Sequence, residues 1–105
     1  MNRLPFVFLP EGQADFDEAY DWYELHRTGG GDKFADAVQR TIDLITAFPR
    51  LGTLKYRDVR QRLVLRFPYV LIYREAGGTI HIVSVFHTSR DPQAWVSRVD
   101  DLDTP

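Results

Sequence analysis

Arginine side chains that alternate with apolar residues are the feature of this sequence most suited to chemistry. In the run 59–67, Arg60, Arg62 and Arg66 occupy even positions, and the odd positions are mostly apolar. Side chains of a strand point alternately to its two faces, so this spacing predicts one apolar face and one guanidinium face. Guanidinium groups bind phosphates and carboxylates. The face could therefore bind nucleic acid, an acidic protein or an acidic peptide, and simple solvation is equally compatible with it.

Histidine and tryptophan residues near the end of the chain are further candidates. His81 and His87 share one parity of the last apolar run, so we expect at least one of them to be structural. His87 could act as a general acid or base, because imidazole titrates near neutral pH. Trp95 is of a type that more often fills a core than forms a contact.

Several kinds of chemistry are not predicted. Two histidines without a carboxylate cluster do not make a metal site, and no glycine-rich loop precedes a Lys-Ser or Lys-Thr pair. The chain has no cysteine, which excludes disulfides and a cysteine nucleophile. We therefore expect no metal, no cofactor and no small-molecule substrate.

Length and charge limit the class of protein. At 105 residues the chain can form one domain, 1–105, with one modest core. No apolar run approaches the ~18 residues of a membrane span and no signal pattern opens the chain, so we expect a cytoplasmic protein with no membrane partner. Residues 1–49 contain four Lys/Arg and nine Asp/Glu. Residues 50–98 contain nine Lys/Arg and three Asp/Glu, and residues 99–105 contain three Asp and no Lys or Arg. The first half of the chain is therefore acidic and the half that contains the predicted sheet is basic, which suggests that the protein has one cationic surface.

Three successive strands are predicted in the second half of the chain. The arginine run 59–67 is followed by the apolar runs 69–73 and 80–87, and the last two are joined by a hairpin loop that contains Gly77 and Gly78. Both apolar runs are typical of interior strands buried on two faces. Residues 6–9 form a fourth strand, which can persist only by joining this sheet because it is so short.

Two longer helices precede these strands. Apolar residues recur with helical spacing from about Gly12 to His26. Asp32 is a suitable N-cap for a second helix over 33–48, which Pro49 ends. The short loop between the two helices predicts an antiparallel hairpin that covers one face of the sheet.

A short terminal helix completes the predicted architecture. Asp91 is a suitable N-cap with Pro92 at the first helical position, and we expect the acidic tail 99–105 to be frayed. Residues 50–54 are interpreted as a connection. The element order thus predicts an α+β domain in which an N-terminal strand joins a mainly antiparallel four-stranded sheet, an antiparallel two-helix hairpin packs on that sheet, and a short C-terminal helix follows.

In order and spacing, several segments resemble the RelE/ParE superfamily of bacterial toxins. They are Tyr20-Asp21-Trp22-Tyr23, Phe48-Pro49-Arg50-Leu51-Gly52, the run from Arg62 to Tyr73, and the run from His87 to Trp95. The arginine followed by the Phe-Pro-Tyr strand, together with the His, Arg-Asp-Pro and Trp near the end, is most similar to the ParE branch.

This resemblance implies a growth-inhibiting toxin of a type II toxin–antitoxin system, neutralised by a cognate antitoxin that wraps it. Such a toxin meets DNA only indirectly, through the DNA-binding half of the antitoxin. ParE-like members are associated with inhibiting DNA gyrase, and RelE-like members with cutting messenger RNA in the ribosomal A site. We expect the first, a protein that acts by binding and is not an enzyme.

Two alternatives remain open at this stage. A ribosome-dependent endonuclease would use Arg62, which matches the superfamily's arginine, together with His87 and Arg90. It would lack the tyrosine that RelE-type nucleases carry near the carboxyl end, because no tyrosine follows Tyr73. The other alternative is a degenerate member that only binds an antitoxin.

Two sets of residues are expected to contact partners. The predicted target-binding residues are Arg60, Arg62, Arg66, Arg90, Trp95 and Arg98. The predicted antitoxin-binding residues, on the helix hairpin beside a sheet edge, are Tyr20, Trp22, Tyr23, Phe34 and Val38. Trp22 departs from the apolar stripe of its helix, so it either packs under the glycine loop or forms part of an exposed apolar groove.

Overall fold

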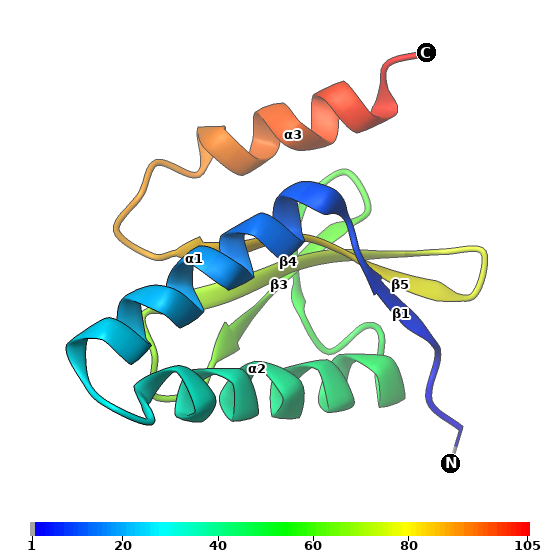
Figure 1. Ribbon diagram of the computed structural model, residues 1–105. Helices are drawn as coiled ribbons and strands as arrows, with labels where there is room; N and C mark the ends of the chain where they lie inside the picture. Colours follow the sequence, from blue (N-terminus) through cyan, green and yellow to red (C-terminus); the bar gives the residue numbers. More distant parts are fainter. Residues whose placement is uncertain (1) are drawn as a thin grey trace.

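The computed structural model describes residues 2–105, which form three helices and five strands (Figure 1). In chain order these are β1 (Phe6–Phe8), α1 (Pro10–His26), α2 (Gly30–Ala47), β2 (Thr53–Tyr56), β3 (Val59–Val64), β4 (Tyr69–Ala76), β5 (Thr79–His87) and α3 (Gln93–Asp103). The predicted α+β architecture with a two-helix hairpin is confirmed. Within residues 2–105, no helix combines the length and the apolar character needed to cross a membrane.

The sheet contains five strands in the order β1-β5-β4-β3-β2, one more than the sequence predicted. β1 runs parallel to β5, and every other neighbouring pair is antiparallel. The additional strand is β2, whose Thr53 pairs with Gln61, although we expected this segment to be a connection. β2 was missed because it is a short edge strand that is mostly exposed, so it lacks an apolar pattern.

An apolar core lies on each face of the sheet. The larger core joins the faces of α1 and α2 to one side of the sheet and includes Phe34, Ile45, Leu71 and Ile82. The smaller core packs Trp95 and other residues of α3 against the opposite side. Figure 1 shows this layering, with α1 and α2 running as a hairpin and α3 lying apart from them. Both faces are covered because β4 and β5 are apolar along almost their whole length, as predicted.

The arginine strand differs from its predicted pattern. Val64 is fully buried in the larger core, and Arg60 and Arg62 share its face because residues i, i+2 and i+4 of a strand point the same way. β3 ends at Val64, and the segment that contains Leu65 and Arg66 forms a turn to β4. The prediction of a guanidinium face opposite the core is therefore wrong. Arg60 and Arg62 lie on the side of the sheet that α2 covers.

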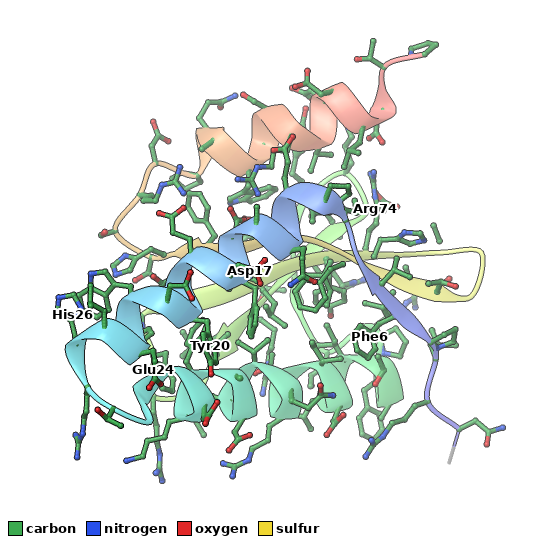
Figure 2. The ribbon with its side chains drawn as sticks, in the orientation of Figure 1. Phe6, Asp17, Tyr20, Glu24, His26 and Arg74 are labelled. Atoms are coloured by element: carbon green, nitrogen blue, oxygen red, sulfur yellow. The ribbon has the colours of Figure 1, made fainter. Side chains whose placement is uncertain are left out.

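The junction of α1 and α2 also departs from its predicted capping. α2 begins at Gly30 after Gly29, whose φ is 83°, a left-handed conformation that suits glycine. The Glu24 carboxylate accepts hydrogen bonds from the N–H groups of Gly29 (3.2 Å) and Gly31 (3.1 Å). Asp32 lies inside the helix and accepts a hydrogen bond from the Tyr20 hydroxyl (2.7 Å). Figure 2 shows Tyr20 and Glu24 pointing from α1 toward the start of α2. Glu24, and not Asp32, thus caps the second helix.

The C-terminal helix is longer than expected. Pro92, and not Asp91, occupies the N-cap position, although the Asp91 carboxylate accepts a hydrogen bond from the Gln93 N–H (2.9 Å), and the helix continues to Asp103. Val99 is buried in the smaller core, and Asp103 forms ion pairs with Arg57 (2.9 Å) and Arg74 (2.7 Å). The prediction that residues 99–105 are frayed is wrong for residues 99–103, because ion pairs with the sheet hold this part of the helix.

These ion pairs predict an acid-sensitive contribution to stability. Hydrogen bonds from Arg74, and then from Arg57, lower the pKa of Asp103 from 3.8 to about 2. A carboxylate whose pKa is lower in the folded state stabilises the fold above its unfolded pKa, and this contribution is lost as the pH falls toward the folded value. We expect Asp103→Asn to be less stable than wild type at pH 5, and the difference in free energy of unfolding to vanish between about pH 4 and pH 2.

Urea unfolding at several pH values measures this difference. Asp101→Asn is the matched control, because Asp101 lies on the same helix and forms no ion pair within residues 2–105. The control should stay near wild type throughout. A difference for Asp103→Asn that persists unchanged at pH 2 would contradict the assignment.

Candidate functional site

An open groove lies between α2 and β3. We call it the α2–β3 groove; its volume is about 860 Å³. Its lining residues are Lys33, Asp36, Ala37, Arg40, Thr41, Leu44, Thr53, Gln61, Arg62, Leu63, Leu65, Arg66 and Phe67. Four of these residues are cationic and one is anionic, so the groove has a net positive charge in a chain whose overall charge is −2.

The four cations of the groove form no ion pair within residues 2–105, unlike most other arginines of the sheet. Arg74 binds Asp58 (2.6 Å) and Asp103, and Arg57 binds Asp100 (3.0 Å). The hydrogen bond to Asp103 raises the pKa of the Arg74 guanidinium. Figure 2 shows Arg74 on the sheet side of α3. Arg57 and Arg74 thus brace α3, whereas the cations of the groove are available to a partner.

Apolar side chains and an unpaired strand edge accompany these cations. Leu63 is 52% exposed and Leu65 is 70% exposed, although both belong to the apolar positions of the predicted arginine strand. β2 pairs with β3 only as far as Gln61, so the outer edge of β3 beyond that residue has no neighbouring strand within residues 2–105. The groove can therefore offer charge, apolar contact and backbone hydrogen bonds together.

Arg66 occupies an unusual backbone conformation at one end of the groove. Its φ is 73°, in the left-handed region that is rarely populated by residues other than glycine, asparagine and aspartate. The turn places Leu65 and Arg66 at the surface, and both side chains are exposed.

A second, smaller hollow lies between α1 and the end of β5. We call it the α1–β5 cleft; its volume is about 340 Å³. Its lining residues are Asp15, Glu18, Ala19, Asp21, Trp22, Leu25, Tyr69, Val85, His87 and Arg90. Trp22 is 53% exposed and stacks on His26 with 3.9 Å between ring centroids. Figure 2 shows His26 at the far end of α1.

The predicted nuclease residues divide between these two hollows. Arg62 lines the α2–β3 groove, whereas His87 and Arg90 line the α1–β5 cleft. The His87 Nδ1 accepts a hydrogen bond from the Ser89 N–H (3.0 Å). The Arg90 guanidinium lies over the Phe86 ring, 4.9 Å from its centroid. The structure does not bring the three residues into one hollow.

Three of the predicted target-binding residues contact other parts of the protein, and one of them, Trp95, is enclosed. Trp95 is buried in the smaller core. Arg98 binds Asp15 (2.6 Å) and Glu11 (2.7 Å) on α1, and the hydrogen bond to Asp15 raises its pKa. Arg60 donates to the carbonyl oxygen of Gly52 (2.9 Å). Trp95 is buried and Arg98 is neutralised by carboxylates of α1, so the prediction that these two residues form an exposed contact surface is wrong, whereas Arg60 is partly exposed. Arg62, Arg66 and Arg90 keep accessible positions.

The predicted antitoxin-binding set is similarly divided. Phe34 and Val38 are buried in the larger core and cannot offer a contact surface, which corrects that part of the prediction. Tyr23 is half-buried against the same core. The Tyr20 hydroxyl donates a hydrogen bond to Asp32, and this hydrogen bond raises the pKa of the Tyr20 phenol. Trp22 is the member of the set with a largely exposed side chain.

Sequence reasoning missed several residues that line the α2–β3 groove. Lys33, Asp36 and Arg40 recur at i, i+3 and i+7, so they follow one side of α2, and this spacing was a usable signal. Leu63 and Leu65 were predicted only to lie on the apolar face of a strand, because they alternate with arginines. Only the pairing of β3 shows that they are exposed.

The fold and the family comparison define a protein of the RelE/ParE toxin superfamily. It consists of a strand, a two-helix hairpin, a mainly antiparallel sheet and a closing helix, with a cationic groove beside the second helix. The fold is similar to a chain from the chromosomal ParDE toxin–antitoxin system of P. aeruginosa, with a TM-score of 0.58, 21% sequence identity, and coverage of 81% of this chain and 96% of that chain. The chain belongs to the family described as the ParE toxin of the type II toxin–antitoxin system parDE, whose model matches residues 6–92. No curated protein matches the sequence.

Family membership makes the chain the toxin component of a type II toxin–antitoxin system and implies a cognate antitoxin as its partner. The match covers every element from β1 to β5 and ends just before α3. Both hollows are therefore built mainly from the matched part of the chain.

Proposed function

We propose that this protein is a cytoplasmic toxin that inhibits DNA gyrase by binding it and that breaks no covalent bond. Membership of the ParE family supports gyrase as the target, because ParE-like members are associated with that enzyme. The target is contacted at the α1–β5 cleft, where Arg90, Trp22 and Leu25 are exposed together. Aromatic residues and arginine contribute most to protein interfaces of this kind.

The separation of Arg62 from His87 and Arg90 is the observation that carries the binding mechanism. Cleavage of RNA requires a base, an acid and a cation within hydrogen-bonding reach of one phosphate. Here Arg62 lines one hollow, whereas His87 and Arg90 line the other, so the three predicted nuclease residues do not surround one site. The hollow that contains His87 also contains Glu18 and Asp21, whose carboxylates repel a phosphate backbone. The geometry thus favours contact with a protein over catalysis on RNA.

Two parallel assays with purified protein test this function. In a DNA gyrase supercoiling assay we expect inhibition, and with programmed ribosomes we expect intact messenger RNA. Intact gyrase activity together with cleaved message would replace the proposal by a ribosome-dependent endonuclease. Activity in neither assay, combined with tight antitoxin binding, would identify a degenerate member.

Replacing Arg90 tests the contact surface. We expect Arg90→Ala to weaken gyrase inhibition roughly tenfold, because Arg90 is exposed and lines the cleft. Arg27→Ala is the matched control: Arg27 is exposed just after α1 and lines neither hollow. The concentration that gives half-maximal inhibition in the supercoiling assay is measured for both variants. Equal inhibition by wild type and Arg90→Ala would show that Arg90 does not contact the target.

A further inference from the structure

We propose that His26 is a positioning residue for Trp22, and that it holds the Trp22 ring in the orientation in which this ring contacts the target. The inference rests on the proposed function, which assigns the target contact to the α1–β5 cleft. Trp22 lines that cleft and His26 does not. The role assigned to His26 is therefore to act through Trp22, and not to touch the target itself.

The rings of His26 and Trp22 are stacked along the surface of α1. Residues i and i+4 of a helix are neighbours on one side of it, and Figure 2 shows His26 at the C-terminal end of α1. The imidazole and indole centroids are 3.9 Å apart, and the two ring planes are inclined by only 21°. Such a stack is an attractive contact. Trp22 remains 53% exposed, so the imidazole covers one part of the indole and leaves the rest open to a partner.

A hydrogen bond fixes the imidazole in its turn. The His26 Nδ1 lies 2.7 Å from the carbonyl oxygen of Trp22. A carbonyl oxygen can only accept a hydrogen bond, so Nδ1 carries the hydrogen and donates it. The imidazole is thus bound to the backbone of Trp22 and stacked on the side chain of the same residue. These two constraints together restrict the rotation of the indole.

Trp22 needs this support because the interior of the protein does not hold it. Within residues 2–105, Trp22 belongs to neither apolar core, and its other ring contact is an edge-to-face approach to Tyr23 at 5.0 Å. A side chain that rotates freely before binding loses that freedom at the interface, and a side chain that is already fixed avoids the loss. Tryptophan is also among the residues that most often dominate the affinity of a protein interface.

A double-mutant cycle on gyrase inhibition tests the positioning role. We expect Trp22→Ala to raise the half-inhibitory concentration on the order of 30-fold. His26→Ala should raise it roughly threefold to tenfold, the cost of ordering one side chain on binding. In the Trp22→Ala background, His26→Ala should have no further effect, because the residue through which it acts is gone. Effects of the two replacements that multiply would overturn the inference, and so would Trp22→Ala inhibiting as well as wild type.

Replacement by phenylalanine separates the ring of His26 from its hydrogen bond. Phenylalanine can stack on Trp22 but cannot donate to the carbonyl oxygen, so His26→Phe should restore most of the inhibition that His26→Ala loses. Arg27→Ala is the matched control, because Arg27 is the next residue of the chain, is exposed and lines neither hollow. It should inhibit gyrase as wild type does. Equal losses in His26→Phe and His26→Ala would show that the ring does not position Trp22.

Fluorine NMR of protein labelled with fluorotryptophan observes Trp22 without any target. The chain contains two tryptophans, and Trp22→Phe identifies the signal of the exposed one. We expect His26→Ala to narrow this signal and to shift it toward that of free fluorotryptophan, whereas the signal of the buried Trp95 stays in place. If His26 only stabilised the end of α1, its replacement would lower Tm and leave the Trp22 signal unmoved. That result would overturn the inference.

Growth assays distinguish failure of this inference from failure of the gyrase assignment. The same cycle can be measured as the inducer concentration that halves the growth rate, which depends on contact with the target whether or not the target is gyrase. A wild type that arrests growth without inhibiting gyrase, together with coupling between Trp22 and His26, would reject gyrase and keep the positioning role. Independent effects of the two replacements in both assays would overturn the inference and leave gyrase as the target.

Discussion

Replacing Arg98 by methionine should destabilise the fold by about 3 kcal/mol. The Arg98 guanidinium reaches from α3 to both oxygens of Asp15 on α1, at 2.6 and 2.9 Å, and the two side chains are only 19% and 12% exposed. The same carboxylate accepts hydrogen bonds from the Ser84 hydroxyl (2.7 Å) and the Val85 N–H (3.1 Å) on β5. Methionine fills the volume but leaves Asp15 charged and largely desolvated. The uncompensated charge, and not the lost attraction, causes most of the expected effect.

Urea unfolding at pH 7 measures this cost, with Arg90→Met as the control. Arg90 is exposed, so its replacement should change the free energy of unfolding by less than about 0.5 kcal/mol. The double variant Asp15→Asn/Arg98→Met should regain part of the loss, because asparagine removes the charge and keeps an acceptor for Val85. A double variant that is less stable than Arg98→Met alone would contradict this explanation.

Phe34→Ala should cost about 4 kcal/mol, which corresponds to a fall in Tm on the order of 20 °C. The Phe34 ring is fully buried. It stacks on Tyr23 and Phe16, with centroids 5.1 and 5.8 Å away, and contacts Phe67 and Tyr69 edge to face. Alanine at this position leaves a cavity between α1, α2 and the sheet that the surrounding aromatic rings cannot fill without leaving their packed arrangement.

Phe48→Ala provides the comparison for this variant. Phe48 follows the last turn of α2 and is half-exposed, so we expect a loss below about 1 kcal/mol. Thermal unfolding followed by circular dichroism measures both variants. A Phe34→Ala protein with wild-type Tm and weakened antitoxin binding would restore Phe34 to the antitoxin-binding surface on which the sequence placed it.

The elements with strong periodicity could be predicted from the sequence. The apolar stripe of α2 and the continuous apolar runs of β4 and β5 identify their elements because each is long and buried. β2 could not be found in this way, since an exposed edge strand of four residues is defined by its neighbour and not by its own pattern. The prediction of a frayed tail failed because Asp100 and Asp103 are stabilised by Arg57 and Arg74, which lie far away in the sequence.

The candidate site was less predictable than the fold, for a physical reason. Whether an arginine is free depends on which carboxylates the fold brings to it. Arg98 and Arg62 look alike in the sequence, yet one is neutralised by Asp15 and the other has no such partner within residues 2–105. Leu63 and Leu65 mimic a core pattern because they alternate with arginines, but Val64 is the residue that is buried. The residue types indicated which charged and apolar side chains the protein contains. Only the fold shows which of these side chains are exposed and which have a partner.

The pairing of β1 with β5 has a consequence for synthesis of the chain. Phe6 lies beside Ile80, and Asp15 binds Arg98, so the first elements made by the ribosome find their partners among the last. Contacts between such distant parts of a chain form late and slowly. A nascent polypeptide therefore lacks a completed sheet until β5 has been synthesised. An mRNA truncated before the codons of β5 yields a product in which β1 has no neighbouring strand.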